Sequence, residues 1–335
     1  MKPIKWLFSL LAIMILLIPL ISCSKTTSVQ TVRVGEVTRS IFYAPQYVAI
    51  SKGFFEEEGL KVDLKTTWGG DKTMTSLLSD GIDVALVGSE TSIYVYAQGS
   101  SDPVINFAQL TQTDGTFLVA RKKVDQFSWD QLKGKTFLGQ RKGGMPQMVG
   151  EYVLKQHNID PKKDVKLVQN IDFANVANAF ASGTGDYVQL FEPTASILEQ
   201  QGKGHIVASF GKESGTVPYT TFMAKESYLK DNPEAAAKFT RAIYKAQKWV
   251  NTHSTDEIAE VVAPYFEDTP KDTLKTVIDR YKSQKSFATN PLLDQKEWDH
   301  LQKIMDESGE LPRHIDHNKL VNTKFAKDAK DAMSE

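Results

Sequence analysis

The sequence has little cysteine, no excess of either charge and no long apolar run outside its N-terminus. Cys23 is the only cysteine, so an intramolecular disulfide is excluded. Lysine and arginine (40) almost balance aspartate and glutamate (41), which gives no basic patch of the kind that nucleic-acid binding requires. No second apolar run reaches the roughly 18 residues of a membrane-spanning helix. We therefore expect a globular domain without a nucleic-acid partner.

Catalytic and metal-binding patterns are also missing. The six histidines contain one close pair, His314 and His317, which we expect in an exposed C-terminal loop. Neither a Gly-x-Ser-x-Gly elbow nor a phosphate-binding loop occurs. The sequence therefore predicts no cofactor, no metal and no enzymatic activity.

The N-terminus has the pattern of an export signal. Lys2 and Lys5 precede an apolar run at 7–21. This run is short for a membrane span and ends in small residues, as a secretory signal does. We predict a signal peptide over residues 1–22.

The end of this signal resembles a bacterial lipobox. The tetrad Leu20-Ile-Ser-Cys23 follows the order apolar, small, small, cysteine. The resemblance implies cleavage before Cys23, acylation of that cysteine (palmitate among the acyl chains) and a lipid-anchored tether over 23–30. An ordinary signal peptide that ends near a cysteine is the alternative. The lipobox predicts a protein held at the extracytoplasmic face of the cell membrane.

After the tether, strand and helix patterns alternate. Short apolar or alternating runs predict strands at 32–37, 61–66, 83–88, 135–139, 165–169, 186–193 and 205–210. Helical patterns lie between them, at 45–52, 72–79, 89–98, 146–157, 175–182 and 194–200. This succession predicts an α/β fold with parallel strands.

Two extended apolar segments divide the chain into two lobes. They are Gly115–Lys122 and Val217–Lys225, and the residues between them form one inserted unit. Beyond Lys225 the pattern is helical only, at 233–251, 255–266, 273–282 and 295–308. We predict that both segments connect the lobes and that the last helices pack against the first lobe and over the hinge.

Several motifs together carry a family resemblance. They are Pro45–Val62 (PQYVAISKGFFEEEGLKV), Leu78–Gly88 (LSDGIDVALVG), Trp129–Thr136 (WDQLKGKT), Phe191–Pro193 (FEP) and Asn232–Val250. Their order resembles the solute-binding proteins of ABC importers that take nitrate, sulfonates, taurine and thiamine precursors. These proteins share a domain with the thiamine pyrimidine synthases.

The resemblance implies a periplasmic-binding-protein type II fold, with two α/β lobes and a hinge of two crossover strands. Lobe 1 would comprise 31–116 and 224–320, lobe 2 would comprise 117–223, and 321–335 would form a C-terminal tail. It further implies a monomer that closes on a small solute and delivers it to an ABC permease and ATPase.

In such sheets, ligands lie at the carboxyl ends of strands and at helix N-termini. The loops at these positions supply our candidate ligand-binding residues. In lobe 1 they are Ser40, Tyr43, Trp68, Ser89, Glu90 and Thr91, and in lobe 2 Arg141, Gly143, Gly144 and Glu192.

These residues favour two kinds of solute. Hydroxyl groups, Arg141 and the exposed backbone N–H groups of two glycines suit an anionic head such as a sulfonate. Glu90 and Glu192, with aromatic side chains at Tyr43 and Trp68, suit a flat heterocycle that carries amines. We favour the thiamine-precursor-like heterocycle slightly over alkyl sulfonates, taurine or nitrate, because Glu90 replaces the small or hydroxyl residue expected in a sulfonate binder.

Simpler interpretations stay open. Arg141 and Lys142 suit a solvated surface pair, the two glycines suit a turn, and Glu90 suits the dipole of the following helix. Glu192 precedes a proline in a motif that is partly structural. An enzyme is the rival from another class, but the related synthases rely on a cysteine-rich segment that this chain lacks.

Overall fold

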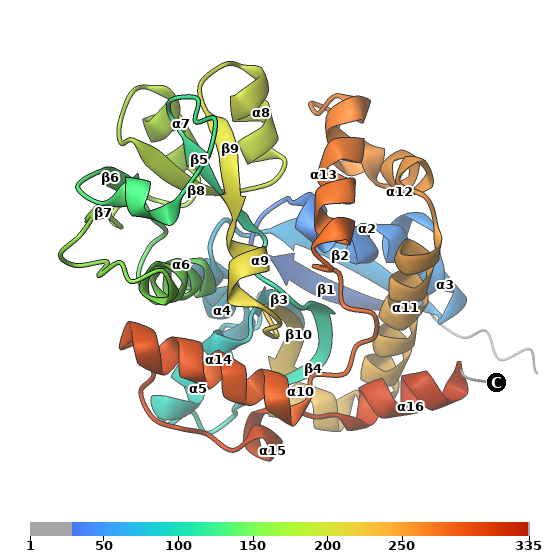
Figure 1. The fold of residues 1–335 in the computed structure, drawn as a ribbon. Helices are drawn as coiled ribbons and strands as arrows, with labels where there is room; N and C mark the ends of the chain where they lie inside the picture. The colour runs from blue at the N-terminus through green and yellow to red at the C-terminus, as the bar shows by residue number, and fades with distance from the viewer. Residues whose placement is uncertain (1–28, 334–335) are drawn as a thin grey trace, which may run out of the picture.

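The computed structural model describes residues 29–333. The predicted signal peptide and Cys23 lie outside these residues. The described chain forms two lobes, each built around a five-stranded sheet with helices on its faces (Figure 1).

The first sheet has the strand order β2-β1-β3-β10-β4. Its strands are β1 (Gln30–Glu36), β2 (Leu60–Thr66), β3 (Val84–Gly88), β4 (Val104–Thr111) and β10 (Thr220–Lys225). β1 pairs in parallel with β2 and β3, whereas β10 runs antiparallel to β3 and β4. The apolar run of β3 is buried because helices cover the sheet.

Short helices follow the parallel strands of this lobe. They are η1 (Ile41–Tyr43), α2 (Ala44–Ser51), α3 (Phe54–Glu57), α4 (Gly70–Leu78) and α5 (Glu90–Ala97). Pro45 lies in the first turn of α2, where its missing N–H has no helical partner to lose. The strand and helix positions predicted for this lobe agree with the structure, apart from β4 and the short helix α3, which were not predicted.

The second sheet has the order β7-β6-β8-β5-β9. Its strands are β5 (Thr116–Ala120), β6 (Thr136–Leu138), β7 (Lys166–Val168), β8 (Tyr187–Phe191) and β9 (His205–Ser209). Its helices are η2 (Trp129–Leu132), α6 (Met145–Gln156), α7 (Val176–Ala181), α8 (Thr194–Gln200) and α9 (Phe210–Ser214). The repeated β-α-β style predicted for this half is present.

The chain crosses between the lobes twice. The two predicted linkers largely form strands β5 and β10, and the crossings themselves lie just before them, at 112–115 and 215–219. The N–H of Val217 donates to the carbonyl of Gln112 at 3.0 Å, which joins the two crossings. The return crossing therefore precedes 220–223, residues that the sequence had assigned to lobe 2 and that pair in the first sheet.

The C-terminal part is helical, with α10 (Glu226–Asp231), α11 (Pro233–Thr252), α12 (Thr255–Val262), η3 (Ala263–Tyr265), α13 (Lys271–Ser283), α14 (Gln295–Ser308), α15 (His317–Leu320) and α16 (Lys324–Ala332). α11 packs on α2 and α3, where Phe239 meets Phe55 at 4.9 Å between ring centroids. α16, predicted as a tail, is an amphipathic helix against α11. Within residues 29–333, no helix has both the length and the apolar character of a membrane span.

α13 and α14 also contact the second lobe. The guanidinium of Arg280 on α13 pairs with Glu192, and the imidazole Nδ1 of His300 on α14 lies 2.6 Å from the carbonyl oxygen of Thr216. α14 packs along α6 (Figure 1). α13 and α14 thus contact both lobes, in line with the predicted packing over the hinge.

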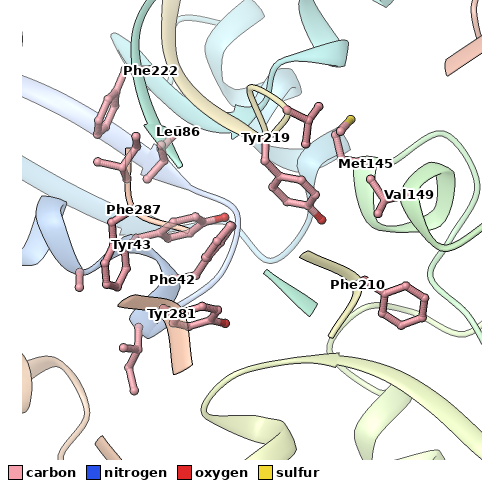
Figure 2. Close-up of a cluster of buried hydrophobic side chains, with 14 of the residues drawn as sticks. Phe42, Tyr43, Leu86, Met145, Val149, Phe210, Tyr219, Phe222, Tyr281 and Phe287 are labelled. Carbon is pink, nitrogen blue, oxygen red and sulfur yellow. The ribbon is translucent and has the colours of Figure 1, made fainter. Parts of the chain in front are cut away.

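An aromatic cluster fills the region where the lobes meet. Phe42 contacts Tyr281 at 5.2 Å and Tyr219 at 5.6 Å between centroids. Figure 2 shows Phe42, Tyr43 and Tyr281 together, with Tyr219 beside Met145 of α6. A Cβ at Gly115 would lie 2.8 Å from the ring of Phe42, so the first crossing needs glycine there.

Candidate functional site

A cavity of about 510 Å³ lies between the lobes. This size is within the usual range of small-molecule sites. The first lobe lines it through Thr38, Tyr43, Gly69, Gly70, Asp71, Met74, Glu90, Thr91, Tyr94, Tyr219 and Thr220, among others, and the second through Gln140–Pro146, Phe173 and Phe191. It therefore lies at strand ends and at the starts of α4, α5 and α6.

Six of the ten predicted ligand-binding residues line this cavity: Tyr43, Glu90, Thr91, Arg141, Gly143 and Gly144. Asp71, Lys142 and Phe191 line it as well. The other four predicted residues, Ser40, Trp68, Ser89 and Glu192, do not.

Ser40 and Glu192 take part in the contact between the lobes. The carboxylate of Glu192 is buried and accepts from the backbone N–H and the hydroxyl of Ser196, both at 2.8 Å. It also pairs with Arg280 at 2.5 Å. The hydroxyl of Ser40 donates to the carbonyl of Glu192 at 2.6 Å. The structural interpretation of the Glu-Pro motif accounts for these contacts.

Ser89 and Trp68 also lie outside the cavity. Ser89 is fully buried, and its hydroxyl donates to the carbonyl of Pro218. Trp68 has a left-handed backbone (φ 59°) and a side chain that is 48% exposed, although the next residue, Gly69, lines the cavity. Tyr47 lies in the core, and its hydroxyl donates to Glu36 at 2.8 Å.

Glu90 is the buried acid of the cavity. It is the first residue of α5 and is only 3% exposed. Its Oε1 accepts from the backbone N–H of Met145, the first residue of α6 in the other lobe, at 3.2 Å. Its Oε2 has no hydrogen-bond partner among residues 29–333. One carboxyl group thus bridges the lobes and keeps one oxygen unpaired.

The surroundings of Glu90 alter its acidity. Burial raises the pKa of Glu90 to about 8, against the lowering effect of two backbone N–H groups, its own and that of Met145. Without a partner, the carboxyl group therefore holds its proton at neutral pH. A cationic or hydrogen-bond-donating partner would favour its ionised form.

Arg141 joins the lobes beside the cavity. One guanidinium nitrogen lies 3.2 Å from Asp71 of α4, and another lies 3.3 Å from Asp172 of the second lobe. The Arg141 side chain is 44% exposed, so these pairs are solvated and each contributes little to stability. Its charge is already matched by two carboxylates, which leaves it poorly placed to hold an anion.

The two glycines precede α6. The N–H of Gly143 donates to the side-chain oxygen of Gln147 at 3.0 Å, and its left-handed φ of 85° favours glycine. Gly144 is the N-cap of α6 and has no side chain with which to cap it. The turn that opens α6 thus exposes the helix N-terminus toward Glu90.

Aromatic side chains form much of the remaining wall. Phe191 lies 5.9 Å from Phe173 and 6.4 Å from Tyr219 between centroids. Tyr219, Phe173 and Tyr94 were not predicted. Tyr219 is the last residue of the return crossing, so its place within a predicted linker was the available signal. Flat walls of this kind suit a planar ligand.

Within residues 29–333, no group of three or more His, Cys, Asp or Glu side chains is arranged to hold a metal ion.

Two α/β lobes that enclose a cavity at their junction define the periplasmic-binding-protein type II architecture. The NMT1-like family model matches residues 26–264, and the chain belongs to that family. This confirms the family resemblance and the fold class predicted from the motifs.

Individual relatives support the same assignment. Over 325 residues the chain is 67% identical to YtlA of Bacillus subtilis (strain 168), whose name provisionally describes a binding protein. The alignment covers 96% of this chain and 97% of that protein. Over 295 residues it is 22% identical to the formylaminopyrimidine-binding protein of Halalkalibacterium halodurans. That alignment covers 82% of this chain and 87% of that protein.

Among solved structures, the alkanesulfonate-binding protein SsuA from Xanthomonas axonopodis pv. citri, bound to MOPS, superposes with a TM-score of 0.71. The match covers 88% of this chain and 98% of that one at 16% identity. At this identity the likeness concerns the fold.

Proposed function

We propose that this protein is the extracytoplasmic solute-binding component of an ABC importer and that its solute is a small nitrogenous heterocycle of the thiamine-precursor kind. Its NMT1-like family, its two-lobed fold and the binding-protein name of a 67% identical relative support the role in solute binding. The formylaminopyrimidine-binding relative supports the solute class.

The buried carboxyl group of Glu90 is the observation that carries the solute class. Glu90 lines the cavity, and its buried Oε2 has no hydrogen-bond partner among residues 29–333. An anionic head group placed there would meet a second acid in a site of low polarity, which costs free energy. A ligand N–H would instead satisfy that oxygen.

The walls agree with a planar solute. Tyr43, Phe191 and Tyr219 line the cavity together with Phe173. Aromatic rings pack well on the faces and edges of a heterocycle. An alkyl sulfonate would make fewer packing contacts with these aromatic walls.

The transport cycle follows from contacts that only the closed form makes. The Glu90–Met145 hydrogen bond and the Arg141–Asp71 ion pair each join one lobe to the other. A solute held between the lobes would favour the closed form, which then docks on the permease. Opening at the permease breaks these contacts and releases the solute.

The anchor belongs to this proposal too. The lipobox-like sequence that ends at Cys23 would place an acylated protein at the extracytoplasmic face of the cell membrane. Labelling of growing cells with a radioactive fatty acid tests it. We expect label on the wild type and none on Cys23→Ala, and unlabelled wild type would overturn the anchor.

A thermal-shift screen of residues 24–335 tests the solute class. The panel holds aminopyrimidines, other nitrogenous heterocycles, taurine, alkyl sulfonates and nitrate. A solute at 100 times its Kd adds about 2.7 kcal/mol of stability, which gives a visible shift. We expect hits among the heterocycles, whereas a hit confined to sulfonates or nitrate would overturn the assignment.

A further inference from the structure

One carboxyl group serves the N-termini of two helices from different lobes. α6 has glycine as its N-cap, so no side chain of its own caps it. The N-cap residue of α5, Ser89, uses its hydroxyl on Pro218 instead. The Glu90 carboxyl group lies at both helix starts, because Glu90 is the first residue of α5 and its Oε1 accepts from the N–H of Met145, the first residue of α6.

Helix N-termini carry free N–H groups and partial positive charge, and two of them directed at one point attract an anion. In this protein a carboxyl group of the chain already occupies that point, and a solute that donates an N–H to it favours its ionised form. A free anion that approached the same point would meet Glu90 rather than the helices.

We propose that Glu90 sets the charge selectivity of the cavity: its carboxyl group fills a latent anion site between α5 and α6, so that the cavity accepts neutral or cationic solutes with an N–H donor and rejects anionic ones. This inference rests on the proposed solute-binding function and deepens it.

The unpaired oxygen of Glu90 supports the acceptance of a donor. Oε2 belongs to a side chain that is 3% exposed and has no partner among the described residues. A Cβ at Gly88 would collide with this oxygen, so the preceding strand leaves room for it. A buried acceptor without a donor is unfavourable, and a solute N–H supplies the donor.

The other charges around the cavity do not reverse this preference. Arg141 is shared between Asp71 and Asp172, and Lys142 is exposed. Glu310 adds one more carboxylate to the lining. Among the charged side chains that line the cavity in residues 29–333, Glu90 is the one that is buried.

A gain of anion binding tests the proposal. Residues 24–335 are prepared as wild type, Glu90→Ser and Glu90→Gln, and ethanesulfonate and sulfate are titrated into each by calorimetry. Serine removes the carboxyl group and leaves both helix N-termini facing the cavity. We expect at least tenfold tighter anion binding in Glu90→Ser than in the wild type.

Two further variants make the result specific. Glu310→Gln removes a cavity-lining carboxylate that lies at no helix N-terminus, and it should raise anion affinity far less than Glu90→Ser does. Glu90→Gln keeps an acceptor for Met145 but replaces Oε2 with a donor. It should lose at least tenfold in affinity for any N–H-bearing heterocycle that binds the wild type, and it remains informative if Glu90→Ser fails to fold.

The outcomes separate this inference from the proposed solute class. Anion gain in Glu90→Ser, with no heterocycle bound by the wild type, supports charge selection and contradicts the heterocycle. A folded Glu90→Ser protein that binds anions no better than the wild type overturns charge selection, as does equal heterocycle affinity in Glu90→Gln and wild type.

Discussion

Two buried glutamates, Glu90 in the cavity and Glu192 at the hinge, differ in how completely they are paired. Glu192 accepts from two donors of Ser196 and pairs with Arg280, which joins the second lobe to α13. Glu90 has one donor from the opposite lobe and one oxygen without a partner. A fully paired buried acid holds structure in place, whereas a half-paired acid in a cavity is prepared for a ligand.

The largest effect is expected when the hinge pair is broken. Arg280→Ala leaves the carboxylate of Glu192 buried without its cation and should lower the free energy of unfolding by about 3 kcal/mol. Urea denaturation measures the loss. As a control, Lys271→Ala breaks an exposed pair with Glu260 and should change stability by less than about 1 kcal/mol. Equal losses of stability in the two variants would contradict the structural role assigned to the Glu192–Arg280 pair.

A carboxylate introduced at the N-terminus of α6 should weaken solute binding in the cavity without destabilising the fold. Gly144→Asp introduces a good N-cap residue beside Met145, at a position where a Cβ meets only ordinary contacts. We expect solute affinity to fall about tenfold, since 1.4 kcal/mol corresponds to that factor. The melting temperature should not fall. Calorimetry reads the affinity, and Gly144→Ala controls for the added Cβ; unchanged affinity in Gly144→Asp would contradict the account.

The pH dependence of stability should differ between wild type and Glu90→Gln. Because the folded-state pKa of Glu90 is about 8, above its ordinary value, the native protein holds a proton that the unfolded chain has released. The free energy of unfolding should therefore fall as pH rises from about 4.5 to 8. Between pH 6 and 8 the variant should lose less stability than the wild type, by at most about 1.4 kcal/mol per pH unit.

Urea unfolding at pH 6, 7 and 8 makes this comparison. Burial raises the pKa of Asp114 to about 6, so this residue contributes to the pH dependence of stability at lower pH. It is present in both proteins. Parallel stability curves for the two proteins above pH 6 would show that Glu90 is not perturbed.

The smallest effect concerns the exposed pair across the cavity. Asp71→Asn removes one partner of Arg141, whose side chain is 44% exposed. We expect a stability change below about 1 kcal/mol and a modest loss of solute affinity that shrinks further in 0.5 M salt. A loss as large as that of Arg280→Ala would mean that this pair, rather than Glu192, holds the lobes.

Regular apolar patterns made much of the fold predictable. The run before Gly88 is buried on both faces, and the stripe of α11 covers α2 and α3, so pattern and structure agree. β4 was missed because it contains Asn106, Gln109 and Thr111, which are buried polar residues. Their partners are distant in sequence: Asn106 bonds to Ser92 and Leu320.

The site was harder to predict than the fold. Glu90 and Glu192 both follow the carboxyl end of a buried strand, and only the tertiary partners, such as Arg280 some 88 residues away, separate their roles. Ser89 follows the same rule and yet points to Pro218. Tyr219 enters the wall because the return crossing passes the cavity, a fact of topology that no local pattern encodes.

Charge selection at Glu90 is tested most directly with ligands of one shape and different charge. Wild-type residues 24–335 would be melted at pH 7 with 4-amino-2-methylpyrimidine bearing either an aminomethyl or a carboxylate group at ring position 5. The account predicts stabilisation by the aminomethyl compound and none by the carboxylate. Stabilisation by the carboxylate alone would contradict it, because the buried acid would then not be setting the charge of the solute.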